Sequence, residues 1–221
     1  MLGTGYDGSA NWIVVVGIGL LGITLSPFAE VLIAKQLPRL GGLPTTLTRM
    51  TTAAMTGFTC ASFALRFGIG FELPAFIFLA VLGVQLARID IEHHLLPNPL
   101  VLALLTGGLL LLLASGIFNQ QADDLLRGAF GALILFAGYL VLGLISPGGI
   151  GMGDIKLAAP VGLYLGYLGW TQVLYGALLG FIVNGLVTLL ILSQKRRTKA
   201  SEVAHGPSML GALAVATLFI R

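Results

Sequence analysis

Residues 98–118 read NPLVLALLTGGLLLLLASGIF, a run that contains no charged side chain. A helix needs about 20 mostly apolar residues to cross the hydrocarbon core of a bilayer, so this run predicts a transmembrane helix. Similar apolar runs recur along the chain. Two of them, residues 156–169 and 207–221, are short for a full crossing. The predicted helices cover residues 12–34, 51–69, 71–90, 98–118, 124–146, 156–169, 171–193 and 207–221.

The composition agrees with a protein that is solvated largely by lipid. Hydrophobic residues make up 57% of the chain and charged residues only 10%, with a mean hydropathy of +0.97. Soluble domains carry about 25% charged residues. We therefore predict an all-α fold, a polytopic membrane helix bundle with about eight transmembrane helices, forming a single domain over residues 1–221. Residues 1–11 lack the basic start of a cleaved signal peptide, so we expect the first apolar segment to be retained.

The distribution of basic residues predicts the orientation. With the N-terminus outside, nine of the twelve lysines and arginines fall on the cytoplasmic side, as the positive-inside rule favours. We therefore expect a multi-pass protein of the plasma (inner) membrane with both termini outside. The net charge of +3 then needs no nucleic-acid partner, and membrane lipid is the expected surrounding. The nine cytoplasmic cations are Lys35, Arg39, Arg49, Arg88, Lys156, Lys195, Arg196, Arg197 and Lys199; the outer three are Arg66, Arg127 and Arg221.

Four acids lie near the cytoplasmic ends of predicted helices: Glu30, Asp90, Glu92 and Asp154. Ionisable side chains at membrane depth are costly and usually functional, so these four are the candidates for chemistry. Glu30 has three open interpretations. It could pair with Lys35, contact a basic peptide, or be an ordinary interfacial residue.

The most informative segment is Gly148-Gly149-Ile150-Gly151-Met152-Gly153-Asp154-Ile155-Lys156. Its glycines leave the backbone unobstructed, so a peptide could pair with it as an added strand beside Asp154. The alternative is structural, with the glycines as a turn and Asp154 as the N-cap of a helix that begins at Ile155. Residues 88–100 form a second polar break, which is either a plain loop or the other half of a site.

Asp90 and Asp154 fall on the same predicted face of the membrane although they are distant in sequence. A pair of carboxylates can hydrolyse a peptide, one as general base towards water and the other as a protonated acid. Two carboxylates about 3 Å apart share one proton because both cannot ionise easily. Either aspartate could serve as the base.

These segments resemble the type IV prepilin leader peptidases. Gly151-Met152-Gly153-Asp154 resembles the GxGD signature of that family, and Asp90 followed by Leu95-Leu96-Pro97-Asn98 resembles its other aspartate segment. Residues 206–212, which read GPSMLGA, are similar to the segment that begins the last helix of the family.

The resemblance implies a membrane-embedded aspartyl endopeptidase that removes the short basic leader from prepilin or pseudopilin precursors at the cytoplasmic face. Asp90 and Asp154 would be its catalytic pair. The residues that we predict to bind the substrate are Gly151, Met152, Gly153, Lys156, Pro97, Asn98 and Glu30.

The chain departs from the larger family members near its N-terminal end. Those members carry a cytoplasmic insert with two zinc-binding CxxC pairs, whereas residues 35–52 contain no cysteine and Cys60 is the only cysteine in the chain. We therefore expect a short, processing form with no metal site and no cofactor. Many members also methylate the new N-terminus with S-adenosylmethionine, and the missing insert argues against that activity here.

Three rival interpretations remain open. Paired acids also suit a small membrane transporter that couples to protons. A non-catalytic assembly protein of a secretion system would need neither acid to react. His93 and His94, beside Asp90 and Glu92, could take part in a metal site, although adjacent histidines on a helix point about 100° apart.

Overall fold

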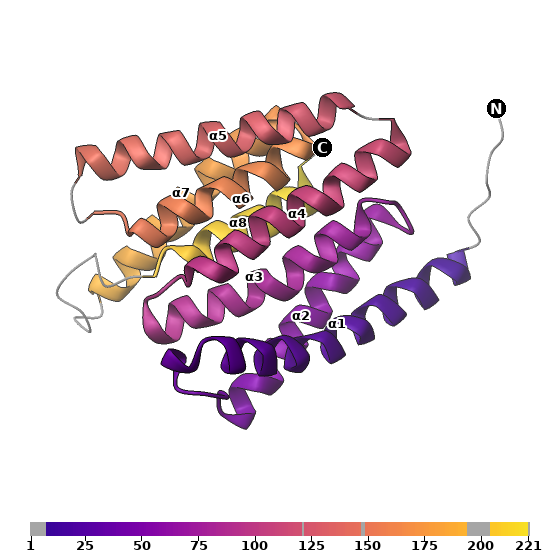
Figure 1. Ribbon diagram of the computed structural model, residues 1–221, viewed down its shortest axis with the longest axis horizontal. Coiled ribbons are helices and arrows are strands. Elements are labelled where there is room, and N and C mark those ends of the chain that lie inside the picture. Colours follow the sequence, from indigo (N-terminus) through magenta and orange to yellow (C-terminus); the bar gives the residue numbers. More distant parts are fainter. Residues whose placement is uncertain (1–7, 121, 147–148, 194–203, 221) are drawn as a thin grey trace. The chain divides into compact units, whose positions relative to one another are not determined.

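The computed structural model describes residues 8–120, 122–146, 149–193 and 204–220. It divides into two compact units, residues 1–85 and 86–221, which are described separately. Every regular element in the described residues is helical, so the predicted all-α class is confirmed (Figure 1). The prediction of a single domain over 1–221 stays a prediction.

Two long antiparallel helices dominate the first unit, α1 (Gly8–Gln36) and α2 (Thr46–Phe67). The short 3-10 helix η1 (Pro38–Leu40) and two glycines with positive φ, Gly41 and Gly42, connect them. The helices approach closely, because a Cβ on Gly22 would lie 2.8 Å from the Cys60 Sγ. Helix α3 (Leu73–His93) begins in this unit and continues into the second.

The second unit is built around α6 (Met152–Leu168), most of whose residues are buried. This helix packs against α4 (Asn98–Asn119), α5 (Ala122–Ile145), α7 (Trp170–Ser193) and α8 (Gly206–Phe219). Proline lies in the first turn of both α4 and α8, where a missing backbone N–H costs nothing. The helix that carries Asp154 is therefore the centre of its unit.

Helices α5 and α6 meet backbone to backbone. A Cβ on Gly166 would lie 2.6 Å from the Arg127 carbonyl oxygen and 3.0 Å from the Gly128 Cα, and the Gly162 backbone lies directly against Gly131. Small residues at such a contact are characteristic of helix packing in membranes. The contact fixes α6 against α5 with no side chain between them.

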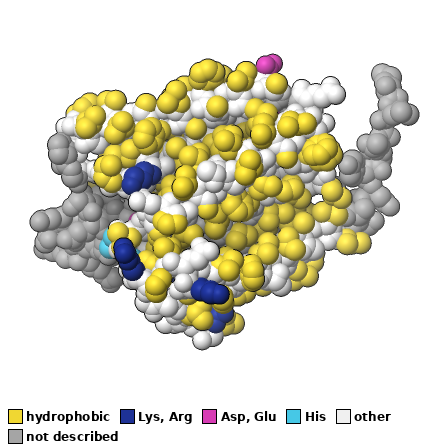
Figure 2. Space-filling view, viewed as in Figure 1, with side chains coloured by type: hydrophobic (Ala, Val, Ile, Leu, Met, Phe, Trp, Pro, Cys, Tyr) yellow, Lys and Arg dark blue, Asp and Glu magenta, His cyan; other side chains and the backbone are white. Residues whose placement is uncertain are grey.

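Among the described residues, five helices are long and apolar enough to cross a membrane: α1, α3, α4, α5 and α7. Their outward surfaces carry many large apolar side chains, and hydrophobic side chains dominate the face drawn in Figure 2. The chain is therefore a multi-pass membrane protein. The eight predicted helices all form, although α2, α6 and α8 fall outside that criterion of length and apolarity.

Candidate active site

Asp154 lies in the first turn of α6. The N-cap of this helix is Gly151, so Asp154 is its third residue and the alternative that made it the N-cap is wrong. Its carboxyl group accepts a hydrogen bond from the Gly151 N–H, as the third residue of a capping box does. Helix α6 thus fixes both the position of Asp154 and the direction of its side chain.

Asp90 lies in the last turn of α3. This helix ends at His93, three residues beyond the predicted end, and His94 follows with a φ of +51°. The Asp90 Oδ2 accepts a hydrogen bond of 3.0 Å from the backbone N–H of Gly206, the first residue of α8. The carboxylate therefore lies at the N-terminus of α8, where unpaired N–H groups and the helix dipole favour an anion.

The structure brings Asp90 and Asp154 within electrostatic range of each other. They are 5% and 9% exposed, so little water screens them. Burial, and then the negative charge of Asp90, raise the pKa of Asp154 from its ordinary 3.8 to about 7. In the folded protein Asp154 therefore keeps its proton from pH 3.8 up to about 7, where a free aspartate would have lost it.

Glycines make room for this arrangement at three places. A Cβ on Gly151 would lie 3.0 Å from the Asp154 Oδ2, and one on Gly206 would lie 2.7 Å from the Asp90 Oδ2. A Cβ on Gly153 would lie 2.9 Å from the Cβ of Leu96, which precedes α4. Glycine thus lets the backbone approach each carboxyl group closely and lets α6 begin beside Leu96; a larger residue at these positions would require its neighbours to shift.

The other predicted substrate-binding residues of this unit lie around the N-terminus of α6 and the N-terminus of α4. Met152 is exposed, and Pro97 is the half-buried N-cap of α4. The exposed Lys156 Nζ donates to the Asn98 Oδ1 at 2.9 Å. The structure thus brings the glycine segment and the Leu95–Asn98 segment together as neighbours of the aspartates.

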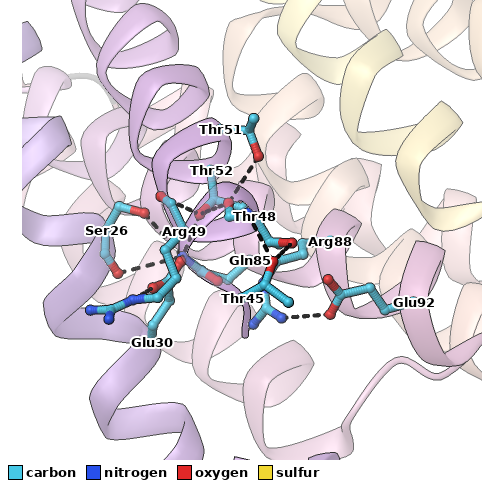
Figure 3. Close-up of polar contacts among 10 residues, drawn as sticks. All are labelled: Ser26, Glu30, Thr45, Thr48, Arg49, Thr51, Thr52, Gln85, Arg88 and Glu92. Carbon is cyan, nitrogen blue, oxygen red and sulfur yellow. Dashed lines mark hydrogen bonds and ion pairs between the residues drawn. The ribbon is translucent and has the colours of Figure 1, made fainter. Parts of the chain in front are cut away.

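Of the two histidines predicted as a possible metal site, His93 makes an ordinary surface contact and His94 interacts electrostatically with Asp90. Glu92 pairs with Arg88 at 2.8 Å, as Figure 3 shows, and His93 Nε2 lies 3.9 Å from the same carboxylate. Over the described residues, no three side chains of His, Cys, Asp or Glu come together as a metal site would require.

Glu30 lies in the first unit, and its side chain is completely buried (Figure 3). It accepts hydrogen bonds from the Thr52 hydroxyl at 2.6 Å, from Arg49 Nε at 3.0 Å and from Gln85 Nε2 at 3.5 Å. Arg49, rather than the predicted Lys35, is therefore its ionic partner. These contacts favour a structural role, and the predicted contact of Glu30 with a substrate stays a prediction.

Three features of the site were missed by the sequence interpretation. Gly206 was noted only for its resemblance to the family, and its hydrogen bond to Asp90 was not foreseen. Tyr139 and His205, which bond to each other at 3.1 Å beside the site, gave no signal because an isolated tyrosine in an apolar run looks like an ordinary core residue. Pro147, Gly148 and the basic residues 195–199 lie outside the described residues.

Residues 75–190, more than half of the chain, match the type IV leader peptidase family. This match spans both aspartates and the GxGD segment. The chain therefore belongs to that family.

Several curated proteins named prepilin leader peptidase/N-methyltransferase are similar to it. The protein of Stutzerimonas stutzeri is 30% identical over 71% of this chain and 53% of its own length. That of Xanthomonas campestris pv. campestris is 28% identical over 82% of this chain and 62% of its own length, and that of Bacillus subtilis 35% over 51% and 43%. The chain thus spans roughly half of the relatives it matches. No solved structure matches it significantly. Nothing in these similarities supports the transporter alternative.

Proposed function

We propose that this chain is an aspartyl endopeptidase that removes the short basic leader from prepilin or pseudopilin precursors, with Asp90 and Asp154 as its catalytic pair. The observation that carries the proposal is the electrostatic coupling of two buried carboxyl groups in one compact unit, which leaves a proton on Asp154 near neutral pH. Membership of the family supports the choice of reaction.

The environments of the two acids suggest their roles. Asp154 is the acid, because its pKa of about 7 leaves a large fraction of the molecules protonated there in neutral solution, ready to donate a hydrogen bond to the scissile carbonyl. Asp90, oriented by the Gly206 N–H, is the base that takes a proton from water. The hydroxide adds to the carbonyl carbon, the C–N bond then breaks, and the leaving amine takes a proton from the pair.

The substrate backbone would lie beside residues 149–153. Exposed Gly151 and half-buried Gly153 present little side-chain bulk there, so a peptide could approach as an extended strand. Met152 offers an apolar contact, and Lys156, Asn98 and Pro97 border the same region.

The proposed orientation places the pair at the cytoplasmic face of the inner membrane with both termini outside. The nine-to-three bias of basic residues supports it. We propose proteolysis alone, without S-adenosylmethionine, since residues 35–52 contain no cysteines for the zinc-binding insert of larger members.

The test is leader removal from a co-expressed prepilin in membranes. Asp90→Asn and Asp154→Asn should each lower cleavage at least 1,000-fold, of the order found when one member of a catalytic group is removed. Asp123→Asn, at an exposed aspartate in the first turn of α5, is the matched control and should cleave normally. Normal cleavage by either site variant, at equal membrane abundance, would exclude this mechanism.

A further inference from the structure

Three aromatic side chains enclose the start of α8. The Tyr139 hydroxyl from α5 and the His205 Nε2 are 3.1 Å apart. The Tyr139 ring stacks on Phe181 of α7 with centroids 5.1 Å apart, and Phe181 lies 5.7 Å from the His205 ring. Tyr139, Phe181 and His205, here called the aromatic clamp, thus tie the residue before α8 to two neighbouring helices.

The aromatic clamp acts on the backbone that contacts Asp90. His205 is the N-cap of α8, and the next residue, Gly206, donates its N–H to the Asp90 Oδ2 at 3.0 Å. A Cβ on Gly206 would lie 2.7 Å from that oxygen, so the carboxylate and the backbone are in close contact. Moving His205 would therefore turn or withdraw the N–H group that orients Asp90.

His205 is held in a position that its own polarity does not favour. Its Nδ1 is buried and has no hydrogen-bond partner among the described residues, and it makes no side-chain cap to α8. Burial also lowers the pKa of His205, so the ring is uncharged near neutral pH. The hydrogen bond to Tyr139 is thus the polar contact that fixes this ring, and leaving Nδ1 unpaired is its cost.

We infer that Tyr139 and His205 are positioning residues for Asp90, acting through the Gly206 N–H. Tyr139 is buried and lies near enough to Asp154 for their charges to interact, so the aromatic clamp is close to both members of the pair. The inference rests on the proposed peptidase function, because its consequence is the geometry of the base in that reaction.

The experiment measures kcat and KM for leader removal by the purified full chain in proteoliposomes. Tyr139→Phe keeps the ring stack and removes the hydroxyl. His205→Asn keeps an amide near Nδ1 but cannot reach Tyr139, whereas His205→Gln places one near Nε2. We expect Tyr139→Phe and His205→Asn to lower kcat about tenfold with KM unchanged, and His205→Gln to restore kcat to within about threefold of the wild type.

The double variant Tyr139→Phe/His205→Asn should be no slower than either single variant, because both remove the same bond. Tyr175→Phe, at an exposed tyrosine of α7, is the matched control and should leave kcat unchanged. Thermal unfolding gives the folded fraction, to which each kcat is referred.

The inference is overturned if Tyr139→Phe and His205→Asn match the wild-type kcat per folded molecule, or if His205→Gln is as slow as His205→Asn. Loss of thermal stability with unchanged kcat would equally exclude it in favour of a purely structural clamp. If the wild type itself fails to cleave and behaves like Asp90→Asn, the proposed function fails and this inference falls with it.

Discussion

The two units of the chain each bury carboxylates but treat them in opposite ways. Glu30, in residues 1–85, is surrounded by donors: a guanidinium, a hydroxyl and an amide. Asp90 and Asp154, in residues 86–221, accept backbone N–H groups, and no lysine or arginine ion pair to either is found in the described part of the chain.

This contrast is the one we expect between a structural acid and the proposed reactive pair. The Glu30 carboxylate accepts hydrogen bonds from three protein donors, so its oxygens are already engaged within the fold. Two buried carboxyl groups that lie close together oppose each other's ionisation, so one of them keeps its proton to a higher pH than a free aspartate would. Burial alone does not distinguish the two cases; the partners of each acid do.

The largest effect expected from this contrast is on stability at Asp154. An acid whose pKa is raised on folding binds its proton more tightly when folded, so the folded state loses stability as pH rises from 3.8 through about 7. Asp154→Asn does not ionise and should therefore be more stable than the wild type at pH 8, by at most about 4 kcal/mol at ~1.4 kcal/mol per pKa unit. The gap should close by pH 4. Chemical unfolding in detergent at both pH values measures it, and a gap that does not depend on pH would contradict the raised pKa.

The opposite result is expected for the acid of the first unit. Glu30→Gln should destabilise the protein by about 3 kcal/mol, because it breaks a buried ion pair and leaves Arg49 without its carboxylate. This value is at the low end of the roughly 3–5 kcal/mol that breaking a buried ion pair costs, because the Arg49 side chain is about one-third exposed.

In cleavage assays, kcat of the folded Glu30→Gln variant should stay within about threefold of the wild type if Glu30 has the structural role that its contacts favour. An increase in KM for a basic leader at constant kcat would instead support the predicted contact between Glu30 and the substrate. A 1,000-fold loss of kcat in Glu30→Gln would contradict the proposed difference between a structural acid in the first unit and catalytic acids in the second.

A smaller effect is expected at Gly153. Gly153→Ala places a Cβ 2.9 Å from the Leu96 Cβ, so the first turn of α6 must shift by a few tenths of an ångström. We expect a loss of about 1 kcal/mol in stability and about tenfold in kcat. Gly138→Ala in α5, where an added Cβ meets nothing within 4 Å, is the control and should be neutral or slightly stabilising. Equal stability and equal kcat of the two variants would show that the close contact between Gly153 and Leu96 affects neither quantity.

Most of the helices could be predicted from the sequence because an apolar run of membrane length admits few structures. The helix predicted over residues 98–118 is observed as Asn98–Asn119, and the helix predicted over residues 124–146 is observed as Ala122–Ile145. The end of α3 was misplaced because nothing in Asp90–His93 opposes a helix; the left-handed His94 and the approaching Pro97 end it.

The site was only partly predictable for a related reason. Motif spacing could select Asp90 and Asp154 as candidates because the chain contains only nine acidic residues, so each stands out. The partners of those acids depend on which helices pack together. Local sequence does not predict that the Gly206 N–H bonds to Asp90. It also does not predict that Glu30 pairs with Arg49 and not with Lys35.

The backbone contact between α5 and α6 bears on how this unit could open to admit the proposed substrate. At Gly131 and Gly162 no side chain lies between the two helices, so separating them there would break close-packed backbone contacts. We therefore expect any motion that admits a long polypeptide to move α5 and α6 together as one rigid body.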